Sequence, residues 1–330
     1  MRIMVVGAVE GGSVPLGRSL CQGFLRHGHQ AEWLDFSGLQ PEYARLRSSQ
    51  EPGGIRAFVL GLRRRLIDEV MRFQPELILG MAQCPLNNVE VLGALKRAGI
   101  RLGYWLVEDG SVFTYWKELA PHFDHFFVIQ QEPFLSQLRS IGCRHPHYLP
   151  VAFDDHAPPA PEAAGADIGC SFVGAPYPNR VRFLREIAGP DLQIFGEGWD
   201  QHPNASVVGG ERRLSEQECR GIYERSRVNL NLHSSLRQDG FGDGDFVNPR
   251  TFEIAGLGQF QIVDQRRLLP LHFDAVSEVP AYDTWRDYKE AIRYFLQHED
   301  ERKAMAAKAQ QRVLTKHTYA HRAAEILGMM

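Results

Sequence analysis

The chain has 330 residues, of which 44% are hydrophobic and 23% charged, a balance that is ordinary for a globular protein. Its length exceeds what one hydrophobic core usually supports, so we expect two domains. A formal net charge of −3 argues against nucleic-acid or membrane-surface binding that rests on charge alone. No apolar run approaches the roughly 20 residues that a membrane helix needs.

The N-terminus and the cysteines bear on location. The opening residues, MRIMVVGAVEGG, hold a strand-length apolar run and then glycines, whereas a secretory signal has a longer apolar core and a small-residue cleavage site. The five cysteines lie far apart and form no Cys-x-x-Cys pair, as expected in a reducing compartment. The sequence therefore predicts a cytoplasmic protein with no nucleic-acid partner and no membrane insertion.

Strand-like and helix-like segments alternate through the first half of the chain. Residues 2–8, RIMVVGA, form a continuous apolar run that ends in glycine, which is typical of a strand buried on both faces. Further strands are expected at 31–36, 76–81, 101–109, 125–130 and 147–153, and helices at 15–28, 55–74 and 132–142. This alternation predicts a parallel sheet with helices on both faces.

The segment 154–167 is rich in Pro and Ala and predicts a linker, after which the alternation restarts. Strands are expected at 168–175, 192–199, 228–235 and 260–264, and helices at 179–189, 215–227, from 248, over 284–314 and over 321–330. The fold class predicted is α/β, with two Rossmann-like doubly wound domains that face a cleft. The first domain spans 1–153, the second 168–315, and the C-terminal helix 316–330 packs back on the first.

One stretch of the second domain combines a loop rich in Gly and Asp with several signals of a helix start. Residues 243–260, DGDFVNPRTFEIAGLGQF, follow a predicted strand, so they lie at the edge of the sheet where ligands bind. Asn248 is a preferred helix N-cap, and Pro249 suits the first helical position. The free N–H groups of a helix start form an anion site, which phosphate commonly occupies. Arg250 can add charge-assisted bonds to such an anion.

Two carboxylates flank this helix start. Glu253 is placed to accept hydrogen bonds from two neighbouring hydroxyls, as a ribose presents, and Asp245 precedes it with seven residues between them. The pairing predicts a nucleotide sugar. A simpler interpretation stays open, in which Asn248 only caps the helix, Glu253 only complements the helix dipole and the loop is plain surface.

Several segments also resemble a known family. RTFEIAGLGQFQIVD is similar to an R-x-F-E-x-x-A-x-G block, VNLNLHSS to a Leu-Asn-x-His strand, and SFVGAPYPNR to a strand–Gly–Arg opening of a second domain. FGEGW and YLPVAFDD add to the pattern. In these features the chain resembles glycosyltransferases of the two-Rossmann (GT-B) fold, in particular the CgeB-like group. The resemblance runs from residue 100 to the end and is weak before it.

The resemblance implies roles for individual residues. Glu253 matches the second acid of an E-x7-E motif, which binds the donor ribose, and Asp245 stands in place of the first Glu, so its sugar-contacting role is in question. His233 and Arg180 match positions near the donor phosphates, although a strand-end histidine and an exposed first-turn arginine would explain them too. The predicted donor-binding set is Gly11, Gly12, Arg180, Gly196, His233, Asn248, Arg250, Thr251 and Glu253.

The first domain contributes weaker candidates. Gly11 and Gly12 follow the first strand and can bring backbone N–H groups to the phosphates, whereas Gly196 is equally well explained by a tight turn. Glu108 and Asp109 end a strand and, with Asp245, are the predicted catalytic carboxylates, although Asp109 would also serve as a helix cap. The aromatic residues nearby are expected in the core more than on a sugar face.

We therefore expect a glycosyltransferase that moves a sugar from a nucleoside-diphosphate sugar, a UDP-sugar in preference, to a hydroxyl of a protein, glycan or small molecule. No cofactor and no metal is expected. Asp243-x-Asp245 matches the Asp-x-Asp motif of metal-dependent enzymes, but it lies beside the predicted phosphate-binding helix start and not at the end of a strand. A nucleotide-sugar 2-epimerase and a non-catalytic nucleotide-sugar-binding protein are the alternatives. Dinucleotide-dependent oxidoreduction is the weakest, since no G-x-G-x-x-G fingerprint is present.

Overall fold

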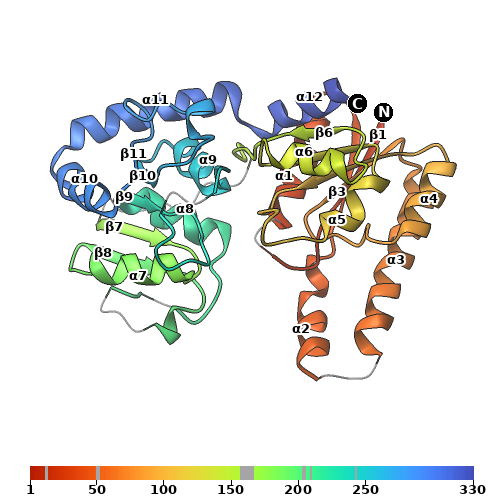
Figure 1. Cartoon of the computed structure of the whole chain (residues 1–330), viewed down its shortest axis with the longest axis horizontal. Helices are drawn as coiled ribbons and strands as arrows, with labels where there is room; N and C mark the ends of the chain where they lie inside the picture. The colour runs from red at the N-terminus through yellow and green to blue at the C-terminus, as the bar shows by residue number, and fades with distance from the viewer. Residues whose placement is uncertain (12–13, 50–52, 157–166, 203–205, 209, 242–243) are drawn as a thin grey trace. The chain divides into compact units, whose positions relative to one another are not determined.

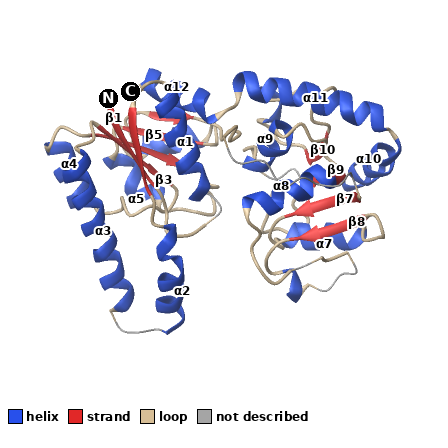
Figure 2. Ribbon diagram, turned by 180° about the vertical axis from the view of Figure 1, so that it is seen from behind, coloured by secondary structure: helices blue, strands red, loops and turns tan. Residues whose placement is uncertain are grey.

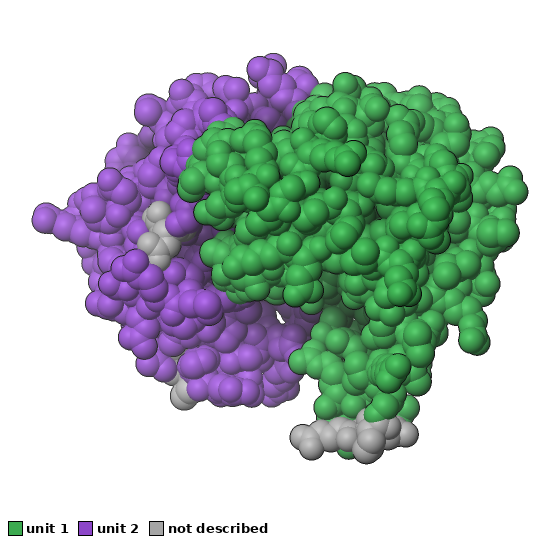
Figure 3. Space-filling view, turned by 45° about the vertical axis from the view of Figure 1, so that its right-hand side comes forward, with its two compact units in different colours: residues 1–154, 319–330 green, residues 155–318 purple. Residues whose placement is uncertain are grey.

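A computed structural model describes residues 1–11, 14–49, 53–156, 167–202, 206–208, 210–241 and 244–330 (Figure 1). The chain divides into two compact units, coloured separately in Figure 3. Unit 1 comprises residues 1–154 and 319–330, and unit 2 comprises residues 155–318. Each unit holds one parallel sheet whose strands lie among helices (Figure 2). The predicted α/β fold class is confirmed.

Unit 1 is built on six parallel strands in the order β2-β1-β3-β4-β5-β6. These strands are β1 (Arg2–Val6), β2 (Gln30–Leu34), β3 (Leu77–Met81), β4 (Arg101–Leu106), β5 (His125–Val128) and β6 (Pro146–Tyr148). The helices are α1 (Val14–Arg26), α2 (Gln40–Ser49), α3 (Gly54–Phe73), α4 (Val89–Arg97), α5 (Trp116–Leu119), α6 (Phe134–Ser140) and α12 (Tyr319–Met329), with 3-10 turns η1 (Ser37–Leu39) and η2 (Ala120–His122). The central strand β3 is buried throughout, as its apolar run predicts.

The C-terminal helix α12 packs on α1 within unit 1. Gly23 of α1 makes this possible, because a Cβ at that position would lie 2.5 Å from the carbonyl oxygen of Tyr319. The chain thus closes the first unit with its last residues, and the backbone N–H of Tyr319 donates to the carbonyl of Phe153 (3.2 Å).

Unit 2 is built on five parallel strands in the order β11-β10-β9-β7-β8. These strands are β7 (Ile168–Val173), β8 (Leu192–Phe195), β9 (Ser226–Asn231), β10 (Gln261–Asp264) and β11 (Ala281–Tyr282). The helices are α7 (Pro178–Glu186), α8 (Glu216–Arg225), α9 (Pro249–Gly256), α10 (Trp285–Gln297) and α11 (Glu299–Lys316), with 3-10 turns η3 (Trp199–Gln201) and η4 (Leu269–Leu271). Helix α8 begins with a capping box, in which Ser215 and Glu218 bond each other's backbone N–H.

The two units share one strand order, since each places its second strand at one edge, then its first, third, fourth and fifth. In such sheets the order in which strands are added reverses between the first and third strands, which lie side by side. Ligands bind beyond the carboxyl ends of those two strands. In unit 2 the two strands are β7 and β9, which pair directly, with Ile168 opposite Ser226 and Phe172 opposite Leu230. This rule singles out the carboxyl edge of β7 and β9 as the place to look for a site.

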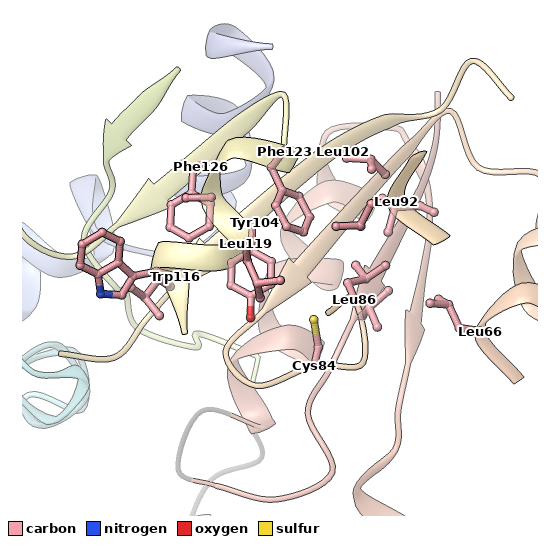
Figure 4. Packing of buried hydrophobic residues seen from close by; sticks show 14 of the residues in the cluster. Leu66, Cys84, Leu86, Leu92, Leu102, Tyr104, Trp116, Leu119, Phe123 and Phe126 are labelled. Atoms are coloured by element: carbon pink, nitrogen blue, oxygen red, sulfur yellow. The ribbon is translucent and has the colours of Figure 1, made fainter. Parts of the chain in front are cut away.

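Unit 1 buries its own apolar core against the sheet, and Figure 4 shows part of it. Tyr104 stacks on Phe126 with ring centroids 5.2 Å apart, and Trp116 meets Phe134 edge to face at 4.8 Å. Tyr104, Trp105 and Trp116 are all buried. The core interpretation of these three aromatic residues is therefore confirmed.

Some elements differ from the sequence prediction. The segment 284–314 forms two helices, because the chain leaves helical geometry at His298, where φ is −113° and ψ is 72°. Helix α2 and the short strand β11 were not predicted, and the strand expected at 147–153 ends at Tyr148, before Pro150. None of the described helices is both long and apolar enough to cross a membrane.

Candidate functional site

Helix α9 starts at the carboxyl edge of β9 in the way the sequence predicts. The Asn248 side chain accepts a hydrogen bond from the backbone N–H of Thr251 (2.9 Å), and Pro249 occupies the first helical position. The next free donor is the backbone N–H of Arg250, which has no hydrogen-bond partner among the described residues. The helix start thus presents an open N–H group at the positive end of the helix dipole.

The guanidinium of Arg250 lies in the first turn of α9, near this open N–H group. It lies over the ring of Tyr223, 5.5 Å from the ring centroid. Its Nη1 atom is buried and has no hydrogen-bond partner in the described part of the chain. A buried guanidinium nitrogen without an acceptor is costly, so this arrangement favours an anion that the folded chain does not itself supply.

Arg180, on the first turn of α7, lies beside Arg250. It donates to the carbonyl of Leu232 from Nη2 (2.6 Å) and Nε (3.1 Å), and to the carbonyl of Ala175 from Nη1 (3.2 Å). Burial, followed by the positive charge of Arg250, lowers the pKa of Arg180 to about 10. Two like charges held this close repel each other, and an anion between them would relieve the repulsion.

Glu253 lies one turn after Arg250 on α9. Its carboxylate is half-buried and accepts no hydrogen bond from any described residue. Burial raises the pKa of this carboxyl, whereas the nearby charges of Arg250 and Arg220 oppose the rise. A carboxylate kept without donors beside two arginines is placed to accept bonds from the hydroxyls of a ligand.

Two charged residues that the sequence did not single out, Asp264 and Arg266, lie beside the predicted His233. Asp264, at the end of β10, is paired with Arg266 through a short ion pair and accepts a bond from the ring Nδ1 of His233 (2.8 Å). The ring Nε2 of His233 accepts from the backbone N–H of Asn248 (3.0 Å). Because both ring nitrogens have partners, His233 offers neither to a ligand and serves the helix start instead.

Thr251, predicted to bind the donor, and Asp245, predicted to be catalytic, both have partners within the protein. Thr251 is buried, and its hydroxyl bonds Asn248 and Asn231 (2.9 Å each). Asp245 is held by Arg267 through a 2.6 Å ion pair, so its carboxylate already has a cation. These contacts give both residues a structural task beside any binding role.

Gly196 closes the turn after β8. Its φ is +130°, a region that favours glycine, and a Cβ there would lie 2.6 Å from the carbonyl oxygen of Gly174. The close approach that the structure shows is thus between the ends of β7 and β8. Its predicted donor-binding role stays a prediction.

Gly196→Ala is expected to lower the free energy of unfolding by about 1–3 kcal/mol, because the new methyl group meets backbone and the residue must keep a positive φ. Equilibrium urea denaturation measures this. Gly189→Ala is the matched control in the same unit, since a Cβ there meets nothing closer than 4.0 Å; its effect should stay within about 0.5 kcal/mol. Equal stability of the two variants would show that the turn is not strained.

The unit 1 candidates lie at the carboxyl edge of its own sheet. Glu108, after β4, accepts bonds from the Tyr115 hydroxyl (2.5 Å) and from Gln83 (3.0 Å). Asp109 accepts from the backbone N–H and the hydroxyl of Ser111 (2.9 and 2.7 Å), which makes it the start of a turn and not of a helix. Gly11 is exposed with φ of +117°, and Gly12 lies outside the described residues.

Comparison with known proteins agrees with this geometry. A family model described as "Glycosyl transferase-like" matches residues 179–328, which include Arg180, α9 and the other unit 2 candidates, but none of the unit 1 candidates before residue 155. Residues 179–328 are therefore glycosyltransferase-like in sequence. The spore protein CgeB of Bacillus subtilis is 22% identical to it over 263 residues, covering 72% of this chain and 78% of CgeB.

Solved structures share the fold of this glycosyltransferase-like protein. Sucrose-phosphate synthase from Thermosynechococcus elongatus superposes with a TM-score of 0.65 at 9% identity, covering 100% of this chain and 98% of the synthase. HepE of Anabaena, solved in complex with UDP-glucose, has a TM-score of 0.62 at 11% identity and covers 100% and 99% of the two chains. The predicted family and fold, and with them the prediction of a glycosyltransferase, are confirmed. The individual site residues stay predictions.

Proposed function

We propose that this glycosyltransferase-like protein transfers a sugar from a nucleoside-diphosphate sugar to a hydroxyl acceptor, without a resident cofactor or metal ion. The observation that carries the proposal is the buried, unpartnered guanidinium nitrogen of Arg250 at the open start of α9, beside Arg180. A diphosphate is the anion that fits two adjacent cations and a helix N-terminus.

The same groups would act on the leaving diphosphate. As the bond between the sugar and the diphosphate breaks, negative charge grows on the phosphate oxygens. Arg250, Arg180 and the dipole of α9 are fixed in place before the reaction, so they stabilise that charge without reorganising. Preorganised charge of this kind commonly supplies a large share of an enzyme's rate enhancement.

We assign the ribose of the donor to Glu253 and the acceptor side to unit 1. The unpaired carboxylate of Glu253 supports the first assignment. Glu108, held by Tyr115 and Gln83, supports the second, because a fixed carboxylate can bind an acceptor hydroxyl or remove its proton. A UDP-sugar is the donor we favour, in keeping with the UDP-glucose complex of HepE, a protein of the same fold.

A thermal-shift screen with UDP-, GDP-, dTDP- and CDP-sugars tests the proposal, since a ligand that binds only the folded state raises the melting temperature. One class of donor should raise it, and release of the nucleoside diphosphate should then require an added acceptor or water. Incubation with donor alone separates the alternatives: an epimerase converts the sugar while keeping the diphosphate bond, and a binding protein leaves the donor intact. No shift with any donor would contradict the proposal.

Glu253→Gln is expected to weaken UDP binding by about tenfold or more, because bonds from ribose hydroxyls to a charged acceptor are lost. Isothermal titration calorimetry with UDP and 2′-deoxy-UDP checks the assignment. The parent should prefer UDP, and the variant should lose that preference. Glu224→Gln, on the neighbouring helix α8, is the control and should bind as the parent does. If Glu253→Gln keeps the preference for UDP, the ribose lies elsewhere.

A further inference from the structure

A chain of buried polar contacts runs beneath the start of α9. It begins at Arg266, passes through Asp264 to the ring of His233, and ends at the backbone N–H of Asn248. The side chains of Arg266, Asp264 and His233 are 0%, 1% and 0% exposed. The residues come from the ends of two neighbouring strands, β9 and β10, so the sheet brings them together.

The contacts fix the protonation state of His233. A backbone N–H can only donate, so the ring Nε2 that receives the Asn248 N–H carries no proton. The ring proton therefore sits on Nδ1 and is donated to Asp264 (2.8 Å). A second proton on Nε2 would set two N–H groups against each other, and the bond to Asn248 would be lost.

Asn248 passes this constraint on to the helix. Its backbone is held by His233, while its side chain donates to Asn231 (2.9 Å) and accepts from the N–H of Thr251 (2.9 Å). Asn248, directly before Pro249, is thus held by three hydrogen bonds. Its position sets where the open N–H of Arg250 points.

We propose that His233, oriented by Asp264 and Arg266, is a positioning residue that holds the first turn of α9 in the geometry that receives the donor diphosphate, and that it does so only while its ring is neutral. This inference rests on the proposed function for its ligand, but the positioning itself does not depend on which ligand binds.

The charged groups that face the ring explain why it stays neutral. Burial comes first, and then the positive charges of Arg266, and more weakly Arg180 of α7, which oppose the pull of Asp264. Together they lower the pKa of His233 to about 4. The edge of the Phe246 ring adds an apolar wall, with ring centroids 6.0 Å apart. Without Arg266, the Asp264 carboxylate would favour the protonated ring.

The sign of the pH effect follows. In the unfolded chain His233 takes up a proton near pH 6.5, whereas in the folded chain it does so only near pH 4. The folded state therefore loses stability as the pH falls from about 6.5 towards 4. Over the lower part of this range the ring also becomes charged in the folded state, and the hold on α9 is lost.

Two substitutions separate positioning from mere packing. His233→Phe fills the space but removes both bonds, while His233→Gln can still accept the Asn248 N–H and does not titrate. His298→Gln, an exposed histidine of unit 2, is the control. Amide hydrogen exchange at pH 7.5 over residues 246–252 should quicken about tenfold or more in His233→Phe, because a buried donor loses its acceptor. It should remain within about threefold of the parent in His233→Gln and His298→Gln.

UDP affinity is then measured on the same proteins at pH 7.5 and 4.5. His233→Phe should bind about tenfold more weakly at both values, while the parent weakens by less than about twofold relative to His233→Gln at pH 4.5, where only a minority of the rings are charged. Unchanged exchange in His233→Phe overturns the positioning role. Faster exchange with unchanged affinity overturns its link to the ligand. If the parent binds no UDP, GDP, dTDP or CDP, the ligand assignment and the proposed function fail together, and exchange still decides the positioning role.

If His233→Phe does not fold, nitrogen-15 NMR of the parent imidazole decides the matter. The inference requires a neutral ring protonated on Nδ1 at pH 6. A ring that titrates near pH 6.5, or one protonated on Nε2, overturns it.

Discussion

Replacing Asp264 by alanine is expected to lower the free energy of unfolding of unit 2 by about 3–5 kcal/mol. The carboxylate is 1% exposed and is shared between the Arg266 guanidinium and the His233 ring. These contacts outweigh the effect of burial, so the pKa of Asp264 lies well below its usual range. Its removal would leave the charge of Arg266 buried without a counter-ion. Breaking one partner of a buried pair costs far more than replacing both.

Urea denaturation followed through Trp199 and Trp285, the tryptophans of unit 2, measures this loss. The double variant Asp264→Asn/Arg266→Met should recover part of it, because no unpaired charge remains. Glu290→Ala, which removes the partner of the exposed Arg286, is the control and should cost less than about 1 kcal/mol. An Asp264→Ala protein as stable as the control would mean that Arg266 is not buried as the structure has it.

Arg250→Gln is expected to weaken the binding of a nucleoside diphosphate by about 100-fold, in line with the loss of a charge-assisted pair in a desolvated site. Its Nη1 atom has no acceptor among the described residues, so no hydrogen bond of that atom is lost, and the contact with the Tyr223 ring is the stabilising interaction removed. Arg250 also repels Arg180. The variant should therefore melt at the same temperature as the parent or higher, as expected where a binding site is built at a cost in stability.

Calorimetric titration with UDP and with uridine checks this prediction, because the loss should fall on the diphosphate alone. Arg182→Gln is the matched control: Arg182 lies on α7 near Arg180 but is exposed and paired with Glu186 at 3.7 Å. It should bind UDP as the parent does. A lower melting temperature with unchanged UDP affinity would make Arg250 a structural residue.

Local signals explain what the sequence predicts well. The alternation of buried apolar runs with amphipathic segments yields the two parallel sheets, because each strand and helix is decided by its own residues. The start of α9 is equally local, since Asn248 and Pro249 are a cap and a first-turn residue whatever surrounds them. Arg250 and Glu253 then follow at fixed positions on the helix.

Contacts distant in sequence explain what was missed. His233 meets Asp264, 31 residues later, and Asp245 meets Arg267, 22 residues later. A signal for the first pair was present, because His233 and Asp264 end two strands that could be expected to be neighbours. The partner of a charged side chain, such as Arg267 for Asp245, depends on tertiary packing, which no short sequence pattern contains.

The most direct test of the account is a crystal structure of the chain with the nucleoside diphosphate selected by the thermal-shift screen. We predict phosphate oxygens within hydrogen-bond distance of the Arg250 N–H and of the Arg250 guanidinium, and ribose hydroxyls that donate to Glu253. A nucleotide that is well ordered at another place, with the Arg250 donors still unpaired, would contradict the account.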